Sequence, residues 1–121
     1  MTSSHIAVLR LHNQQIARSR FQQSHELLAW PGAAKGQDYS GGLWAIGLRL
    51  PGSTEAQIEQ ALLDRIIVRT WALRGTLHMV AADDLRWLLE LLAPRVLAGA
   101  ARRFHQLGLD EATLARSNRL I

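Results

Sequence analysis

Hydrophobic positions along this chain follow a helical period over most of its length. Thr54 and Gln57 have the spacing of a reciprocal capping box, and Ser4 is placed to cap the first apolar run. Glycine and proline separate the periodic segments, because neither residue continues a helix well. The pattern predicts helices over residues 4–17, 20–29, 42–50 and 54–64.

The period changes to alternation over residues 66–80. β-branched and aromatic side chains lie on both sides of Arg74-Gly75, which predicts a β-hairpin. Packing alone predicts that Trp71 fills the core and that Arg69 pairs with a nearby acid such as Asp64. A long helix is expected to follow, with Leu85, Leu88, Leu89, Leu92 and Val96 as its core face.

Helices that close onto a two-stranded hairpin predict a mainly α fold with a small β-hairpin, a winged helix. Helix 54–64 then takes the recognition position. Its carboxylates, Glu55, Glu59 and Asp64, would repel DNA phosphates, so we expect any DNA to bind through another surface. Residues 1–98 are predicted to form a first winged-helix domain and residues 99–121 the start of a second, so the chain is expected to be part of a longer protein.

Composition narrows the class of protein. The chain has 121 residues, a formal net charge of +4, 48% hydrophobic residues and no cysteine. This suits one packed domain without disulfides or thiolate metal sites. The histidines lack metal-site spacing, so neither a metal nor a cofactor is expected. No segment resembles a signal peptide or a membrane span, which predicts a cytoplasmic protein. Basic charge comes from thirteen arginines and one lysine, a bias that suits nucleic acid and that GC-rich codon usage also produces.

Two long motifs resemble a bacterial winged-helix family. They are the segment QDYSGGLWAIGLRLPG at residues 37–52 and the segment VRTWALRGTLH at residues 68–78, followed by DLRWL at residues 84–88. The family is that of the AlkZ-type DNA glycosylases, and the resemblance covers roughly residues 6–98. It implies tandem winged-helix units, double-stranded DNA as the partner and removal of alkylated or crosslinked bases.

The resemblance also implies a catalytic pair, glutamine–any–glutamine or glutamine–any–aspartate, just before the Asp-Tyr of the loop. On this chain the pair falls on Lys35 and Gln37, so the first position departs from the family. A glutamine carbonyl can hold the attacking water and stabilise a cationic sugar, whereas a lysine ammonium has no acceptor. Asp38 is a further candidate as base or electrostatic stabiliser, or it caps the following helix.

Within the hairpin motif, the resemblance implies that Arg69 and Arg74 contact phosphates and that His78 lies near the flipped nucleotide. Three functions therefore remain open: a monofunctional DNA glycosylase, a DNA-binding protein that has lost its catalytic pair, and a protein-interaction domain. Lys35 favours the second, and the acidic helix 54–64 favours the third.

Overall fold

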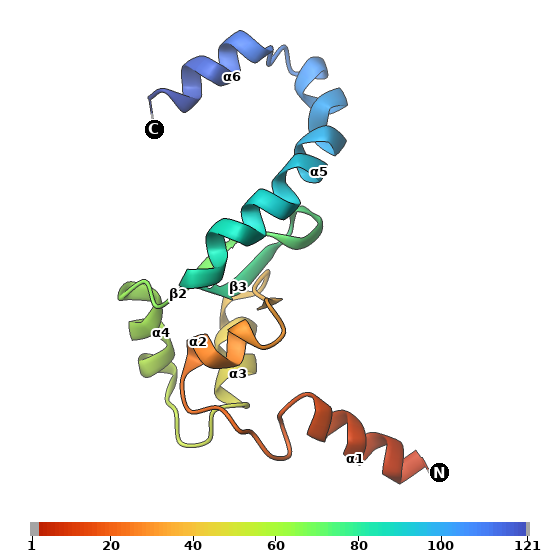
Figure 1. The fold of residues 1–121 in the computed structure, drawn as a ribbon, viewed down its shortest axis with the longest axis vertical. Coiled ribbons are helices and arrows are strands. Elements are labelled where there is room, and N and C mark those ends of the chain that lie inside the picture. Colours follow the sequence, from red (N-terminus) through yellow and green to blue (C-terminus); the bar gives the residue numbers. More distant parts are fainter. Residues whose placement is uncertain (1–2, 121) are drawn as a thin grey trace.

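The body of the molecule consists of short helices packed on a small antiparallel sheet (Figure 1). The structure is a computed structural model that describes residues 3–120. The strands are β1 (Ala34–Lys35), β2 (Ile67–Trp71) and β3 (Leu77–Ala81), in the spatial order β1-β3-β2. The helices around them are α2 (Ser24–Ala29), α3 (Tyr39–Gly47) and α4 (Glu55–Leu63). The predicted fold class, mainly α with a small sheet and compatible with a winged helix, is confirmed.

The core lies where these helices meet the sheet. Leu28 of α2, Ile46 of α3 and Met79 of β3 are each 1% exposed or less. Burial of one such side chain is worth about 1.5–3 kcal/mol. The helical period of segments 42–50 and 54–64 predicts that Leu43, Ile46 and Leu50 share one core face and that Ile58 lies on another, and all four are buried in the same cluster.

The hairpin is also confirmed. Strands β2 and β3 pair antiparallel, and a 3₁₀ turn (Leu73–Gly75) joins them, with Arg74 in the left-handed region at φ 56°. The sequence did not predict β1, which pairs with the other edge of β3. Gly36 permits this pairing, since a Cβ there would lie 3.0 Å from the carbonyl carbon of His78.

Several helix boundaries differ from the prediction. Helix α1 (Ser3–Asn13) ends four residues early, because Gln15 turns the chain at φ 60°. Ser4 lies inside this helix and does not cap it. Helix α2 starts four residues late, after a hydrogen bond from the Gln23 N–H to the Glu26 carboxylate at 3.3 Å. Helix α3 starts three residues early.

The last two helices extend away from the body (Figure 1). After a 3₁₀ turn (Ala82–Asp84) come α5 (Leu85–Gln106) and α6 (Glu111–Asn118). The core face predicted for α5 is confirmed in part, since Leu88 is buried and Leu85, Leu89 and Leu92 are half-buried, whereas Val96 is 37% exposed. The C-terminal part of α5 extends beyond the sheet, so apolar side chains such as Leu97 remain exposed. The helix runs unbroken across residues 98 and 99, and the assignment of residues 99–121 to a second unit stays a prediction.

Candidate functional site

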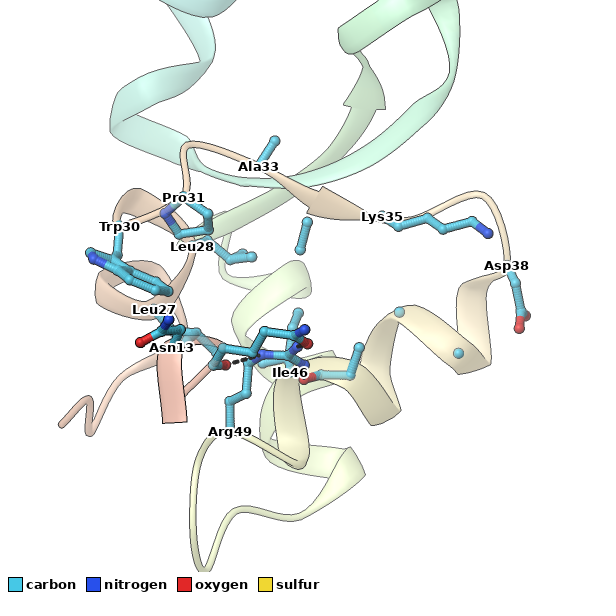
Figure 2. A pocket seen from close by; sticks show the side chains of 15 residues that line it. Asn13, Leu27, Leu28, Trp30, Pro31, Ala33, Lys35, Asp38, Ile46 and Arg49 are labelled. Atoms are coloured by element: carbon cyan, nitrogen blue, oxygen red, sulfur yellow. Dashed lines mark hydrogen bonds between the residues drawn. The ribbon is translucent and has the colours of Figure 1, made fainter. Parts of the chain in front are cut away.

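A cavity of about 540 Å³ lies between α2, α3 and the segment that contains β1 (Figure 2). Leu27, Leu28 and Ile46 give it an apolar lining. Lys35 and Asp38 lie together at one end, whereas Trp30 lies at the other (Figure 2). The volume is in the range typical of small-molecule sites.

Arg69 fixes the loop that follows β1. Its Nε donates to the Gly36 carbonyl at 2.8 Å, and its Nη2 donates to the Gln37 carbonyl at 3.2 Å. The guanidinium also lies 5.6 Å from the centre of the Tyr39 ring. The predicted ion pair of Arg69 with an acid is therefore wrong, because backbone carbonyls and an aromatic face take the guanidinium instead.

Gln37 joins the same loop to the hairpin. Its Oε1 accepts from the Leu77 N–H at 3.1 Å, and the Gly36 N–H donates to the Leu77 carbonyl at 3.0 Å. The side chain thus extends the β1–β3 pairing by one hydrogen bond. An amide oxygen has two lone pairs, so one acceptor position remains for a further donor.

Asp38 is the N-cap residue of α3, yet its side chain makes no capping hydrogen bond. The carboxylate lies beside Gly41, where a Cβ would collide with Oδ2. The prediction that Asp38 caps the following helix is therefore correct about where Asp38 lies. The capping hydrogen bond itself is not made. Lys35 is exposed on β1, opposite His78 in the register. Asp38 and Lys35 give this end of the cavity one acceptor group and one cation.

Tyr39 ties the start of α3 to α4. Its hydroxyl donates to Glu59 Oε1 at 3.1 Å. Partial burial of the ring raises the pKa of the Tyr39 hydroxyl above its usual value, and the hydrogen bond to Glu59 raises it further. No local pattern in the sequence links Tyr39 to a helix twenty positions away.

The three hairpin candidates have different surroundings. Arg74 is exposed at the turn, as expected for a residue beside a glycine. His78 is 8% exposed, and its Nδ1 lies 2.8 Å from the Thr76 carbonyl. Trp71 is 61% exposed, so the prediction that it fills the core is wrong. Ile67, four residues earlier on β2, is fully buried and fills that place.

The sequence does not single out Trp30, because Trp30-Pro31-Gly32 is typical of a helix end. Its ring packs against Phe21, with centroids 5.9 Å apart, and the Arg20 guanidinium lies 5.6 Å from its centre. Exposed tryptophan at a cavity rim is itself a signal for a binding site. Among residues 3–120 there is no group of acidic or histidine side chains that could hold a metal ion. No helix in that range is long and apolar enough to cross a membrane.

The arrangement defines a winged-helix-like domain with a fixed loop at the rim of a cavity of about 540 Å³. The family model described as "DNA glycosylase AlkZ-like" matches residues 28–121, so the chain belongs to the AlkZ-like DNA glycosylase family. The match begins in α2 and includes the loop, the hairpin, α5 and α6. No curated protein and no solved structure matches the chain. Membership supports a glycosylase-like function in DNA repair and DNA as the partner.

Proposed function

We propose that this protein binds duplex DNA containing alkylated or crosslinked bases and hydrolyses the N-glycosidic bond of the damaged nucleotide with an oriented water. Family membership supports the class of reaction. The observation that carries the proposal is the exposed Asp38 carboxylate, which lies at the cavity rim on a loop fixed from three directions. Fixed geometry is what an oriented-water mechanism requires.

In this mechanism Asp38 accepts a hydrogen bond from the attacking water, and its charge stabilises the positive sugar as the base departs. The water oxygen bonds to the anomeric carbon, the carbon–nitrogen bond breaks, and its electron pair leaves with the base. The water proton passes to Asp38 or to solvent. Gln37 offers its second lone pair to the same water, and Arg69 acts as a positioning residue for both.

Contacts with DNA complete the proposal. Arg74 is exposed at the hairpin turn and contacts a phosphate. The Arg69 guanidinium is already bonded to the loop, and His78 is buried, so the DNA contacts predicted for these two residues stay predictions.

A second candidate function is DNA binding without base excision. Lys35 favours it, because an ammonium at the family's first catalytic position has no acceptor and repels a cationic sugar. The hydrogen bond from the Leu77 N–H to Gln37 Oε1 also favours DNA binding without base excision, since this bond gives Gln37 a structural role. Lys35 would then serve to attract phosphate.

Base release from methylated duplex DNA distinguishes the two functions. We expect wild type to release base, Asp38→Asn to lose at least about tenfold in rate, and Lys35→Gln to gain. Asp83→Asn removes an exposed carboxylate outside the site and serves as the control. Binding of the DNA without base release by wild type would establish the second function. Base release that Asp38→Asn leaves unchanged would remove Asp38 from the mechanism.

A further inference from the structure

A second cleft lies between the hairpin turn and α5. It has a volume of about 400 Å³, and Figure 1 shows the turn lying alongside the helix. A Cβ built on Gly75 would lie 3.5 Å from Val96 Cγ1, so the turn packs against α5. The lining combines apolar side chains with two arginines: Leu73, Arg74, Leu92, Arg95, Val96 and Gly99.

The turn holds Arg74 in a fixed place beside this cleft. Hydrogen bonds close the turn, from the Gly75 N–H to the Ala72 carbonyl at 3.2 Å and from the Thr76 hydroxyl to the Leu73 carbonyl at 3.0 Å. Arg74 adopts a left-handed φ of 56°, which is uncommon for a residue with a side chain. Glycine would fit the same backbone better, so the backbone alone does not account for arginine there.

The basic character continues along α5. Arg95 and Arg102 are two helical turns apart and therefore on one face, about 10.5 Å apart along the axis. Arg103 follows beside them. Within residues 91–109 and within the turn there is no acidic residue. The one ion pair among the described residues joins Arg86 to Glu90. The basic wing surface, defined as Arg74, Arg95, Arg102 and Arg103, is therefore free to bind an anion.

The recognition helix has the opposite charge. Glu55 is exposed on α4, Asp64 is exposed at the C-cap of that helix, and Glu59 accepts a hydrogen bond from Tyr39. Phosphates entering beside α4 would meet three carboxylates against one arginine, Arg65, which follows the end of the helix. A polyanion is thus repelled by α4 and attracted by the basic wing surface.

We infer that the basic wing surface binds the phosphate backbone of duplex DNA, so that DNA lies along the hairpin turn and α5 and away from α4. This inference rests on the proposed function for the identity of the partner, and it assigns the surface that holds it. Arginine suits the role because its planar fork pairs with phosphate oxygens. Phosphate contacts are independent of sequence, so the surface serves undamaged DNA as well.

The test measures binding of a fluorescein-labelled, undamaged DNA duplex to the full chain by fluorescence anisotropy at several salt concentrations. Each phosphate contact contributes about −0.9 to the slope of log K against log salt. The double variant Arg95→Gln with Arg102→Gln is expected to flatten the slope by about 1.8. The double variant Arg116→Gln with Arg119→Gln removes the same charge from the C-terminal end of the chain and is expected to keep the slope.

Arg74→Gly supplies a variant that fits the backbone of the turn. It is expected to keep the thermal midpoint of wild type and to flatten the slope by about 0.9. A slope unchanged in all wing variants, or changed equally by the Arg116 and Arg119 control, would overturn the inference. Binding to an acidic peptide with no binding to the duplex would overturn it too.

The two proposals fail differently. Duplex binding with the expected slopes and no base release would overturn the glycosidic reaction and support the surface. Base release with slopes that the wing variants do not change would support the reaction and overturn the surface.

Discussion

At the scale of single residues, Gln37 combines two roles in one side chain. Its amide oxygen extends the β1–β3 pairing through the Leu77 N–H, and the residue directly precedes Asp38, whose carboxylate is proposed to hold water. Gln37→Ala is expected to lower the free energy of unfolding by about 1 kcal/mol, the typical net worth of one hydrogen bond. Urea denaturation followed by circular dichroism measures this change.

Gln37→Glu is the matched variant, because a carboxylate also accepts from the Leu77 N–H. It is expected to retain the stability that Gln37→Ala loses. Equal destabilisation by both variants would show that the hydrogen bond to Leu77 contributes little. Base release by a stable Gln37→Glu protein then reports on the water alone.

On strand β2 the larger apolar side chain, Trp71, is exposed, and the smaller one, Ile67, is buried in the core. Ile67 is 0% exposed and Trp71 is 61% exposed on the same strand. Ile67→Ala is therefore expected to cost about 2–5 kcal/mol, through lost transfer energy and the cavity left behind. Trp71→Ala is expected to change the free energy of unfolding by no more than about 0.5 kcal/mol. Thermal denaturation of both variants compares them, and a larger loss in Trp71→Ala would contradict the burial.

At the scale of elements, the sequence predicts those features that depend on neighbouring residues, such as a helix cap and a hairpin turn. The Thr54 capping box forms as expected, with the Gln57 N–H on Thr54 Oγ1 at 3.3 Å and the Thr54 N–H on Gln57 Oε1 at 2.8 Å. The hairpin follows from alternation and a glycine turn. Strand β1 has two residues and no pattern of its own, so only its pairing with β3 defines it.

The candidate site divides in the same way. Lys35, Gln37 and Asp38 were found from a motif, and the structure places Lys35 and Asp38 at one cavity rim. Their supports come from distant segments, since Arg69 lies 32 residues beyond Gln37 and Leu77 lies 40 beyond it. Contacts of this range depend on the fold, so sequence spacing could not predict them.

Helix α6 depends on its N-cap. Hydrogen bonds from Thr113, including its N–H at 2.8 Å, lower the pKa of Asp110 below the usual 3.8. The carboxylate therefore binds protons less readily in the folded chain, and its stabilisation is present above pH 3.8. It is lost as the pH falls through the lowered pKa. We expect the Thr113 amide resonance to shift in NMR spectra as acid is added below pH 3.8.

Asp110→Asn is the control for this titration. Asparagine caps a helix about as well as aspartate and carries no titrating charge. The variant is expected to keep α6 and to show no shift of the Thr113 resonance over the same pH range. A shift of equal size in both proteins would assign the titration to another group.

At the scale of the whole molecule, a compact body carries helices that extend from both of its ends (Figure 1). Apolar residues on α1, such as Val8 at 60% exposure, and on α5, such as Leu91 at 68%, do not pack on the body. The core face predicted for α5 does not include Leu91, and it is covered only as far as Leu92, since Val96 is exposed. Periodicity identifies an apolar face, whereas burial also requires a surface opposite it.

Acidic and basic side chains are concentrated on different elements of the molecule. The carboxylates of α4 and the arginines of the hairpin turn and α5 lie on different elements, so a net charge of +4 does not describe either surface. Screening limits each charge to roughly 8 Å at physiological salt, so a new charge affects only DNA that lies close to it. A lysine added at a chosen place therefore tests where DNA binds.

Ala56 on α4 and Ala98 on α5 are both exposed helix positions, and lysine suits both. Ala98 lies between Arg95 and Arg102 on the helix, so Ala98→Lys is expected to steepen the salt dependence of duplex binding by about 0.9. Ala56→Lys is expected to leave that slope unchanged, because α4 faces away from the DNA. Fluorescence anisotropy over a salt series compares the two proteins, which have equal net charge. A steeper slope for Ala56→Lys alone would place the duplex against the recognition helix.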